Sequence, residues 1–195
     1  MRPLSPQQQP GFFSPLLRPS RSLALSFLSV IAVGTALLML PIATRDGQGA
    51  AWRDALFTMT SAACISGLTT VSVGQHYTGF GQGVILLGMQ AGALGIMVLS
   101  AMFAFLVGGR LPLRRQAQLE QMLDVGTSQG LRELVIGVTG ITLAVEALGA
   151  VALFAVWHDA FPHWGECAWW SLFHAVSAFC NAGLSLWDNS LHAWV

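Results

Sequence analysis

An uncharged apolar run near the N-terminus constrains this sequence more than any other feature. Residues 22–43 read SLALSFLSVIAVGTALLMLPIA and carry no charge. About 20 apolar residues in a helix match the roughly 30 Å hydrocarbon core of a bilayer. Runs of similar length follow at 80–107 and 134–157, and only 9% of all residues are charged. The sequence therefore predicts an all-α, multi-pass membrane protein rather than a soluble domain.

Two shorter apolar segments lie beside these runs. Residues 51–63 follow the first run and residues 165–178 follow the third, and both are too short to cross a bilayer. We interpret them as half-helices that enter the membrane and turn back, which requires that the turns are buried in protein or line a water-filled cavity. A cleaved signal peptide is the competing interpretation of residues 22–43, but the run is long and no clear A-x-A site follows it.

The arginines indicate the orientation of the chain. Seven of the nine lie before the first run or between the second and third, and two lie between the first and second: Arg2, Arg18, Arg21, Arg110, Arg114, Arg115 and Arg132 against Arg45 and Arg53. Because cytoplasmic loops carry the excess of positive charge, the N-terminus and the loop at 108–133 are predicted to be cytoplasmic. Both half-helices then enter from the outside.

An internal repeat links the two half-helices. Residues 56–68, LFTMTSAACISGL, align with residues 172–184, LFHAVSAFCNAGL, at seven identical positions and an offset of 116 residues. The surroundings repeat as well, since each copy follows an apolar run and a polar loop. A repeated unit of this kind usually defines the architecture.

The repeated unit is suited to holding a dehydrated cation. A half-helix that ends in mid-membrane directs its unpaired carbonyl groups and the negative end of its dipole at the membrane centre. The glycine after it allows positive φ, so that successive carbonyls can point to one side. Neither CISG nor CNAG contains an acidic residue. The pattern therefore favours a monovalent cation held by backbone carbonyls over Ca²⁺ held by carboxylates.

The segments DALFTMTSAACISGLTTV, FGQGVILLGMQAGALGIMVLSA and SLFHAVSAFCNAGLSL resemble the TrkH/KtrB superfamily of potassium transporters, which includes the Trk, Ktr and HKT proteins. The resemblance implies a potassium-uptake pore subunit in which four M1–P–M2 repeats (span, re-entrant pore half-helix with filter loop, span) are arranged as in a potassium channel. It implies that the selectivity filter here includes Cys64, Ile65, Ser66 and Gly67 in the first repeat and Cys180, Asn181, Ala182 and Gly183 in the second. Cys64 and Ser66 stand where the family frequently has threonine.

The same resemblance divides the chain. Residues 1–21 are a cytoplasmic tail, 22–107 the first repeat, 108–133 a cytoplasmic connector, and 134–195 the first span and filter loop of a second repeat. About one and a half repeats are present, so we expect a fragment of a longer subunit or a remainder supplied by another polypeptide. The implied setting is the bacterial inner membrane, with a homodimer of full-length subunits and a cytosolic nucleotide-binding (RCK-type) regulatory ring as partners. No nucleic-acid partner is expected.

Other residues carry weaker signals. Glu146 lies within the third run, where an ionisable group suggests either a contact inside the helix bundle or a direct ion contact. Gly88, Gly92 and Gly95 form a small-residue face, predicted to pack the second span on its own half-helix. Four outer residues could suggest a metal site, but their irregular spacing and the neighbouring tryptophans favour interfacial anchoring: His158, His163, Cys167 and His174.

Several classes of function stay open from the residues. The leading one is potassium uptake, with K⁺ as the transported ion, Na⁺ as a candidate coupled ion and no other metal or cofactor. The alternatives are another re-entrant-loop cation channel or secondary transporter, or a truncated fragment that does not transport. No nucleophile and base occur at a recognisable spacing, so no enzymatic activity is predicted.

Overall fold

The protein is described by a computed structural model over residues 17–107 and 128–188. Within these ranges the chain is helical, and the only β-type pairing is an isolated bridge between Thr44 and Tyr77. The elements in chain order are α1 (Leu17–Leu38), the 3₁₀ helix η1 (Pro41–Ala43), α2 (Trp52–Cys64), α3 (Val73–His76), α4 (Gly79–Val107), α6 (Ser128–Trp157), the 3₁₀ helix η2 (His158–Ala160) and α7 (Trp164–Phe179). This confirms the predicted all-α class for the described residues.

The helices follow the predicted segments, with differences at three ends. α1 begins at Leu17, inside the segment 1–21 that was predicted as a tail. α1 stops at Leu38 and not at residue 43, because Pro41 cannot donate the backbone hydrogen bond that an α-helix needs and instead opens η1. α6 begins at Ser128, inside the segment predicted as a connector. By length and composition, and among the described residues only, the segment 135–160 could cross a membrane, whereas the apolar helix 24–38 is shorter.

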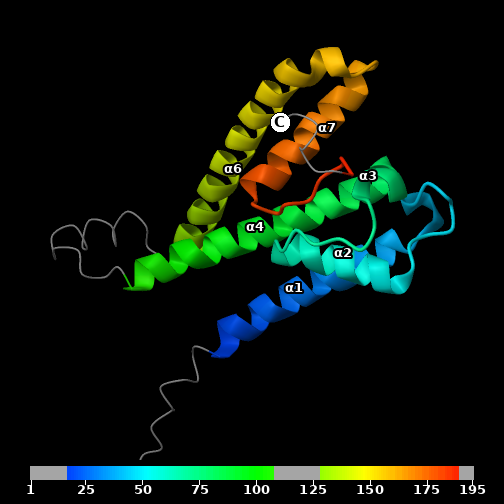
Figure 1. The fold of residues 1–195 in the computed structure, drawn as a ribbon. Coiled ribbons are helices and arrows are strands. Elements are labelled where there is room, and N and C mark those ends of the chain that lie inside the picture. The colour runs from blue at the N-terminus through cyan, green and yellow to red at the C-terminus, as the bar shows by residue number, and fades with distance from the viewer. Residues whose placement is uncertain (1–16, 108–127, 189–195) are drawn as a thin grey trace, which may run out of the picture.

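α4 occupies the centre of the molecule. It contacts α1 and α2 on one side and α6 and α7 on the other. Figure 1 shows the result as two groups, with α1 and α2 below α4 and the α6–α7 pair above it. The segment after α7 runs back over α4 and reaches α3 (Figure 1). The two copies of the repeat therefore lie on opposite sides of one long helix.

Small residues of α4 allow this close packing. A Cβ atom built on Gly88 would lie 2.7 Å from Cε of Met59, and one built on Gly92 would overlap the backbone of Ala63, both in α2. A Cβ on Gly95 would lie 3.1 Å from the Phe27 ring in α1. The prediction that this glycine face packs the second span on its own half-helix is confirmed for Gly88 and Gly92.

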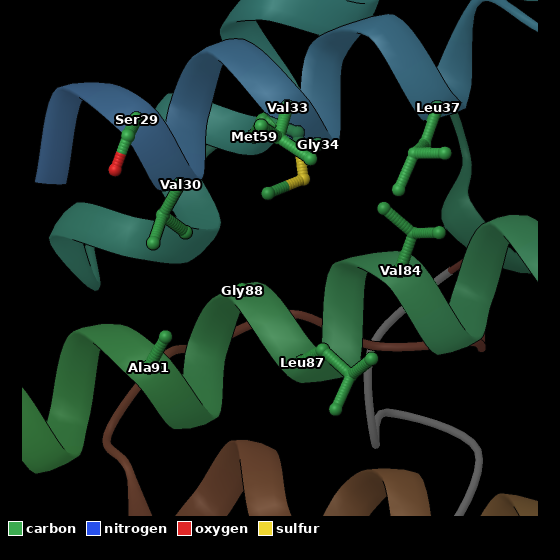
Figure 2. A pocket seen from close by; sticks show the side chains of 10 residues that line it. All are labelled: Ser29, Val30, Val33, Gly34, Leu37, Met59, Val84, Leu87, Gly88 and Ala91. Atoms are coloured by element: carbon green, nitrogen blue, oxygen red, sulfur yellow. The ribbon is translucent and has the colours of Figure 1, made fainter. Parts of the chain in front are cut away.

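A largely apolar pocket of 380 Å³ lies between α1, α2 and α4. In Figure 2 the side chain of Met59 points from α2 into the space between Gly34 of α1 and Gly88 of α4. A Cβ at either glycine would collide with this side chain. The glycines thus let one thioether, which adapts readily to irregular gaps, bridge three helices.

Candidate functional site

The two repeated half-helices end in the same backbone motif. After α2, the Ile65 N–H donates to the Ala62 carbonyl at 3.4 Å and the Ser66 N–H donates to the Ser61 carbonyl at 3.0 Å. After α7, the matching bonds run to Ala178 and Ser177, from Asn181 N–H at 3.1 Å and Ala182 N–H at 2.8 Å. This pair of bonds is the Schellman motif, which ends a helix on a left-handed residue.

The left-handed residues occur at equivalent positions. Ile65 has φ of 58° and its counterpart Asn181 has φ of 55°; two residues later Gly67 and Gly183 have φ of 73° and 68°. Glycine adopts this conformation at little cost and asparagine tolerates it, but a β-branched isoleucine is a true outlier. Such strain costs roughly 1–3 kcal/mol and is concentrated at functional sites in proteins.

The loops that follow the two helices meet at their glycines. A Cβ atom built on Gly67 would lie 2.9 Å from the carbonyl oxygen of Ala182 and 3.3 Å from Cα of Gly183. A Cβ built on Gly183 would lie 3.3 Å from Cα of Gly67. The two loops are thus in backbone contact across 116 residues of sequence, and a Cβ at Gly67 would collide with the backbone of the second loop, whereas a Cβ at Gly183 would fit only tightly.

A serine in each half-helix holds the loop that follows it. The Ser61 hydroxyl accepts hydrogen bonds from the Leu68 N–H and from the Ser66 hydroxyl, both at 3.0 Å. Ser177, its counterpart, donates to the Leu184 carbonyl at 2.6 Å. Neither serine is among the predicted site residues, although the two occupy the same position of the repeat and are identical.

Farther along, each loop is bound to its own half-helix by a second side chain. Thr70 donates to the Asp54 carboxylate at 2.7 Å. In the second copy, His174 Nε2 accepts from the Leu186 N–H at 3.3 Å, and His174 Nδ1 lies 2.8 Å from the Trp170 carbonyl. These contacts assign the proton to Nδ1, because a backbone N–H can only donate to Nε2.

Polar contacts also join the two copies to each other. The carboxylate of Asp188 accepts hydrogen bonds from the Ser72 hydroxyl and the Gln75 amide. The Trp169 indole N–H of α7 donates to Gln82 Oε1 of α4 at 2.7 Å. The copies are therefore fixed relative to each other at the glycines and at the loop ends.

The two predicted filter segments lie next to each other, whereas Glu146 lies apart from the loops. The segments 64–67 and 180–183 lie side by side through Gly67 and Gly183, with Cys64 exposed and Cys180 buried. Glu146 lies outside both loops, buried in α6, with its carboxyl oxygen 3.6 Å from the Cys180 sulfur. The structure thus places Glu146 inside the helix bundle, one of the two arrangements expected for it.

The outer histidines do not gather around a metal. No group of three or more metal-binding side chains occurs among the described residues. His158 is exposed and pairs with Asp159 at 3.1 Å. His174 is buried and bound to Leu186, and Trp157 is buried with its ring edge-on to His174. Both residues pack against the second loop.

The chain is similar in sequence to known cation transport proteins. The TrkH family model, described as cation transport protein, matches residues 17–195. The chain is 36% identical to the potassium/sodium uptake protein NtpJ of Enterococcus hirae, over 91% of this chain and 39% of the relative. It is 39% identical to the Ktr system potassium uptake protein B of Vibrio alginolyticus, over 90% of this chain and 38% of the relative. The corresponding Bacillus subtilis protein is 36% identical over 91% of this chain and 39% of its own length.

The chain spans about two fifths of the length of these curated relatives. The family match, by contrast, covers both half-helices, both loops and the long helix between them. The chain belongs to the TrkH family of cation transport proteins.

Proposed function

We propose that this chain supplies two adjacent quadrants of a selectivity filter for potassium uptake across the bacterial cell membrane. The observation that carries the proposal is the contact between two equivalent loops, each of which leaves a half-helix through a left-handed turn and then a glycine of positive φ. Quadrants related in this way would surround a pore only together with further repeats. Two relatives that match this chain at 36% and 39% identity are named as potassium/sodium and potassium uptake proteins.

The chemistry of the loops supports a monovalent cation. Neither loop contains a carboxylate between residues 64 and 68 or between 180 and 184. Backbone carbonyls, assisted by the negative ends of the α2 and α7 dipoles, then replace the hydration shell of the ion. We therefore expect K⁺ as the main transported ion. Sodium is the second ion to test, since one relative is named for both ions.

The architecture that we propose places each helix in the membrane. α1 and α4 are the two spans of the first repeat and α2 is its pore half-helix, while α6 and α7 are the first span and half-helix of the second. The seven arginines at the N-terminus and in the connector would face the cytoplasm. The exposed apolar side chains of α1 and α6, such as Leu28, Ile141 and Leu148, would contact lipid.

The proposed partners are a second full-length subunit and a regulatory ring. A homodimer and a nucleotide-binding regulatory ring remain expectations from the family, and two relatives are named for a Ktr system. Arg114 and Arg115 lie in the connector, outside the described residues. Reversing both to glutamate should abolish co-purification of the ring subunit if the connector binds it. Unchanged co-purification would exclude these arginines from the contact.

Rubidium uptake tests the filter itself. The polypeptide that carries this sequence is expressed in a bacterium that lacks its own potassium-uptake systems, with Gly67→Ser and Gly183→Ser as variants. Both should lose uptake, because serine fits neither the positive φ nor the space between the loops. Gly47→Ser is the matched control, since Gly47 also has positive φ but nothing within 4 Å of a Cβ. Normal uptake by the Gly67 and Gly183 variants would refute the filter assignment.

A further inference from the structure

A buried polar cluster lies beside the start of the second loop. The sulfur of Cys180 is 3.6 Å from Glu146 Oε1 in α6 and 3.8 Å from Gln90 Oε1 in α4. Glu146 is 3% exposed, whereas neighbouring residues of α6 such as Leu143 and Leu148 are 54% and 71% exposed. One carboxyl group thus faces the interior of the bundle, as does Thr142 one turn earlier, while much of the helix is exposed.

The cluster has more acceptors than the thiol can serve. A cysteine carries one S–H donor, and two oxygens compete for it. Gln90 Nε2 is buried and has no hydrogen-bond partner. An unpaired buried polar group is costly, so the side chains of Gln90 and Glu146, which both contact the Cys180 sulfur, have little freedom to rearrange independently. Moving any one of the three changes the surroundings of the other two.

The first copy of the repeat has no such carboxyl group. The 116-residue offset pairs Glu146 with Val30 and Cys180 with Cys64. Cys64 is exposed, whereas Cys180 is 3% exposed. The two loops have the same backbone but different support, and only the second is braced from behind by a side chain of its preceding span.

The brace acts at a sensitive point of the loop. Cys180 is the last residue before the left-handed Asn181, and the next residue, Ala182, presents the carbonyl oxygen that faces Gly67. Displacing the Cys180 side chain would therefore reorient the first carbonyls of the second loop. A turn that is closely packed between rigid neighbours cannot absorb a displacement of the Cys180 side chain, so it passes the displacement on to the next residues.

We propose that Glu146, together with Gln90, is a positioning residue that holds Cys180 and thereby sets the preference of the second loop for K⁺ over Na⁺. The inferred preference for K⁺ rests on the proposed filter function. The brace, which is the contact of Glu146 and Gln90 with Cys180, does not depend on that function. Glutamine at position 146 keeps the shape and the hydrogen-bonding groups, and leucine keeps only the bulk. Comparing Glu146→Gln with Glu146→Leu therefore separates the effect of hydrogen bonding from the effect of side-chain volume.

Thiol labelling tests the brace without any transport. In a Cys64→Ala, Cys167→Ala background, Cys180 is the single cysteine of these 195 residues, and the reaction of its peptide with a small uncharged maleimide is followed by mass spectrometry. Glu146→Leu should accelerate labelling about tenfold, because one buried hydrogen bond no longer opposes local opening. Glu146→Gln and the exposed-face control Leu148→Ala should label like the parent. Equal rates for Glu146→Leu and Glu146→Gln would overturn the brace.

Competition by sodium tests its consequence in cells. Rubidium uptake is measured with increasing Na⁺ in the otherwise native protein. Glu146→Leu and Gln90→Leu should become more sensitive to sodium, Glu146→Leu by about tenfold and Gln90→Leu by less, whereas Glu146→Gln stays native. Faster labelling with unchanged sodium sensitivity would overturn the positioning role. Absence of uptake in the native protein would refute the proposed function and the K⁺ preference, while labelling still decides the brace. If Glu146→Leu does not fold, Gln90→Leu serves in both assays.

Discussion

Replacing Gly67 by alanine should destabilise the contact between the two loops, and Gly47 provides a control with the same backbone conformation. The φ angles are +73° at Gly67 and +68° at Gly47. A left-handed alanine costs roughly 1–2 kcal/mol at either position. The reduced entropy of the unfolded chain offsets about 0.4–1 kcal/mol of this cost. Gly47→Ala should therefore lower the free energy of unfolding by about 1 kcal/mol or less.

The Gly67 variant carries a steric cost in addition. Its Cβ would lie 2.9 Å from the Ala182 carbonyl oxygen, which belongs to the backbone and cannot rotate away. Overpacking of this kind costs about 1–3 kcal/mol, which brings the expected total for Gly67→Ala to about 1–4 kcal/mol. Gly183→Ala presses on the same contact, with its Cβ 3.3 Å from Cα of Gly67. The double variant should lose less than the sum of the single variants, because one displacement of the loops relieves both clashes.

The thermal midpoint of the purified protein in detergent, with and without K⁺, measures both effects. A cation that binds only the folded protein raises the midpoint, so the native protein and Gly47→Ala should show a potassium-dependent rise. Gly67→Ala should show a lower midpoint and no rise. Equal midpoints for the two variants would refute the steric argument. A preserved potassium-dependent rise in Gly67→Ala would refute the role of the loops in binding the cation.

Two further predictions concern contacts outside the loops. Trp169→Phe should cost about 0.5–1.5 kcal/mol in thermal denaturation, because it removes the indole hydrogen bond to Gln82, whereas Trp164→Phe, at a residue that is 78% exposed, should be neutral. Equal losses would show that the bond adds no stability. Hydrogen bonds from the Thr44 hydroxyl and the Gln48 N–H lower the pKa of Asp46 below its ordinary value of 3.8. A lowered pKa stabilises the folded protein at pH values above the ordinary value, and this gain is lost as the pH falls through the lowered pKa. The higher midpoint of the native protein relative to Asp46→Asn should therefore disappear on acidification. A difference that persists at low pH would refute this prediction.

Much of the fold follows from patterns that the sequence displays directly. The half-helices predicted at 51–63 and 165–178 correspond to α2 (Trp52–Cys64) and α7 (Trp164–Phe179), to within one residue at each end. Short apolar segments between Pro, Gly and polar residues have few alternatives in a chain this apolar. The early end of α1 was also readable, since Pro41 lies inside the predicted span. The short helix α3 was not, because its four residues have no periodicity.

The support of the candidate site was harder to predict. Ser61 and Ser177 are identical in the repeat, yet a serine in a helix usually has only a local partner. Here each one bonds a residue seven positions away, Leu68 or Leu184. His174 was predicted to lie at the membrane interface because tryptophans surround it in sequence. The fold buries its ring against the Leu186 N–H, a contact that only the path of the loop reveals.

The sequence alone determined the class of the protein, the two repeated half-helices and the glycine that follows each of them. The lengths of the apolar runs, the placement of the charges and the repeat offset of 116 residues are properties of the linear sequence, so they can be read without a structure. The tertiary structure decided which groups meet: Gly67 against Ala182, and Glu146 behind Cys180. These contacts depend on how α4 brings the two copies together, and close packing between helices is set by three-dimensional shape rather than by any single segment.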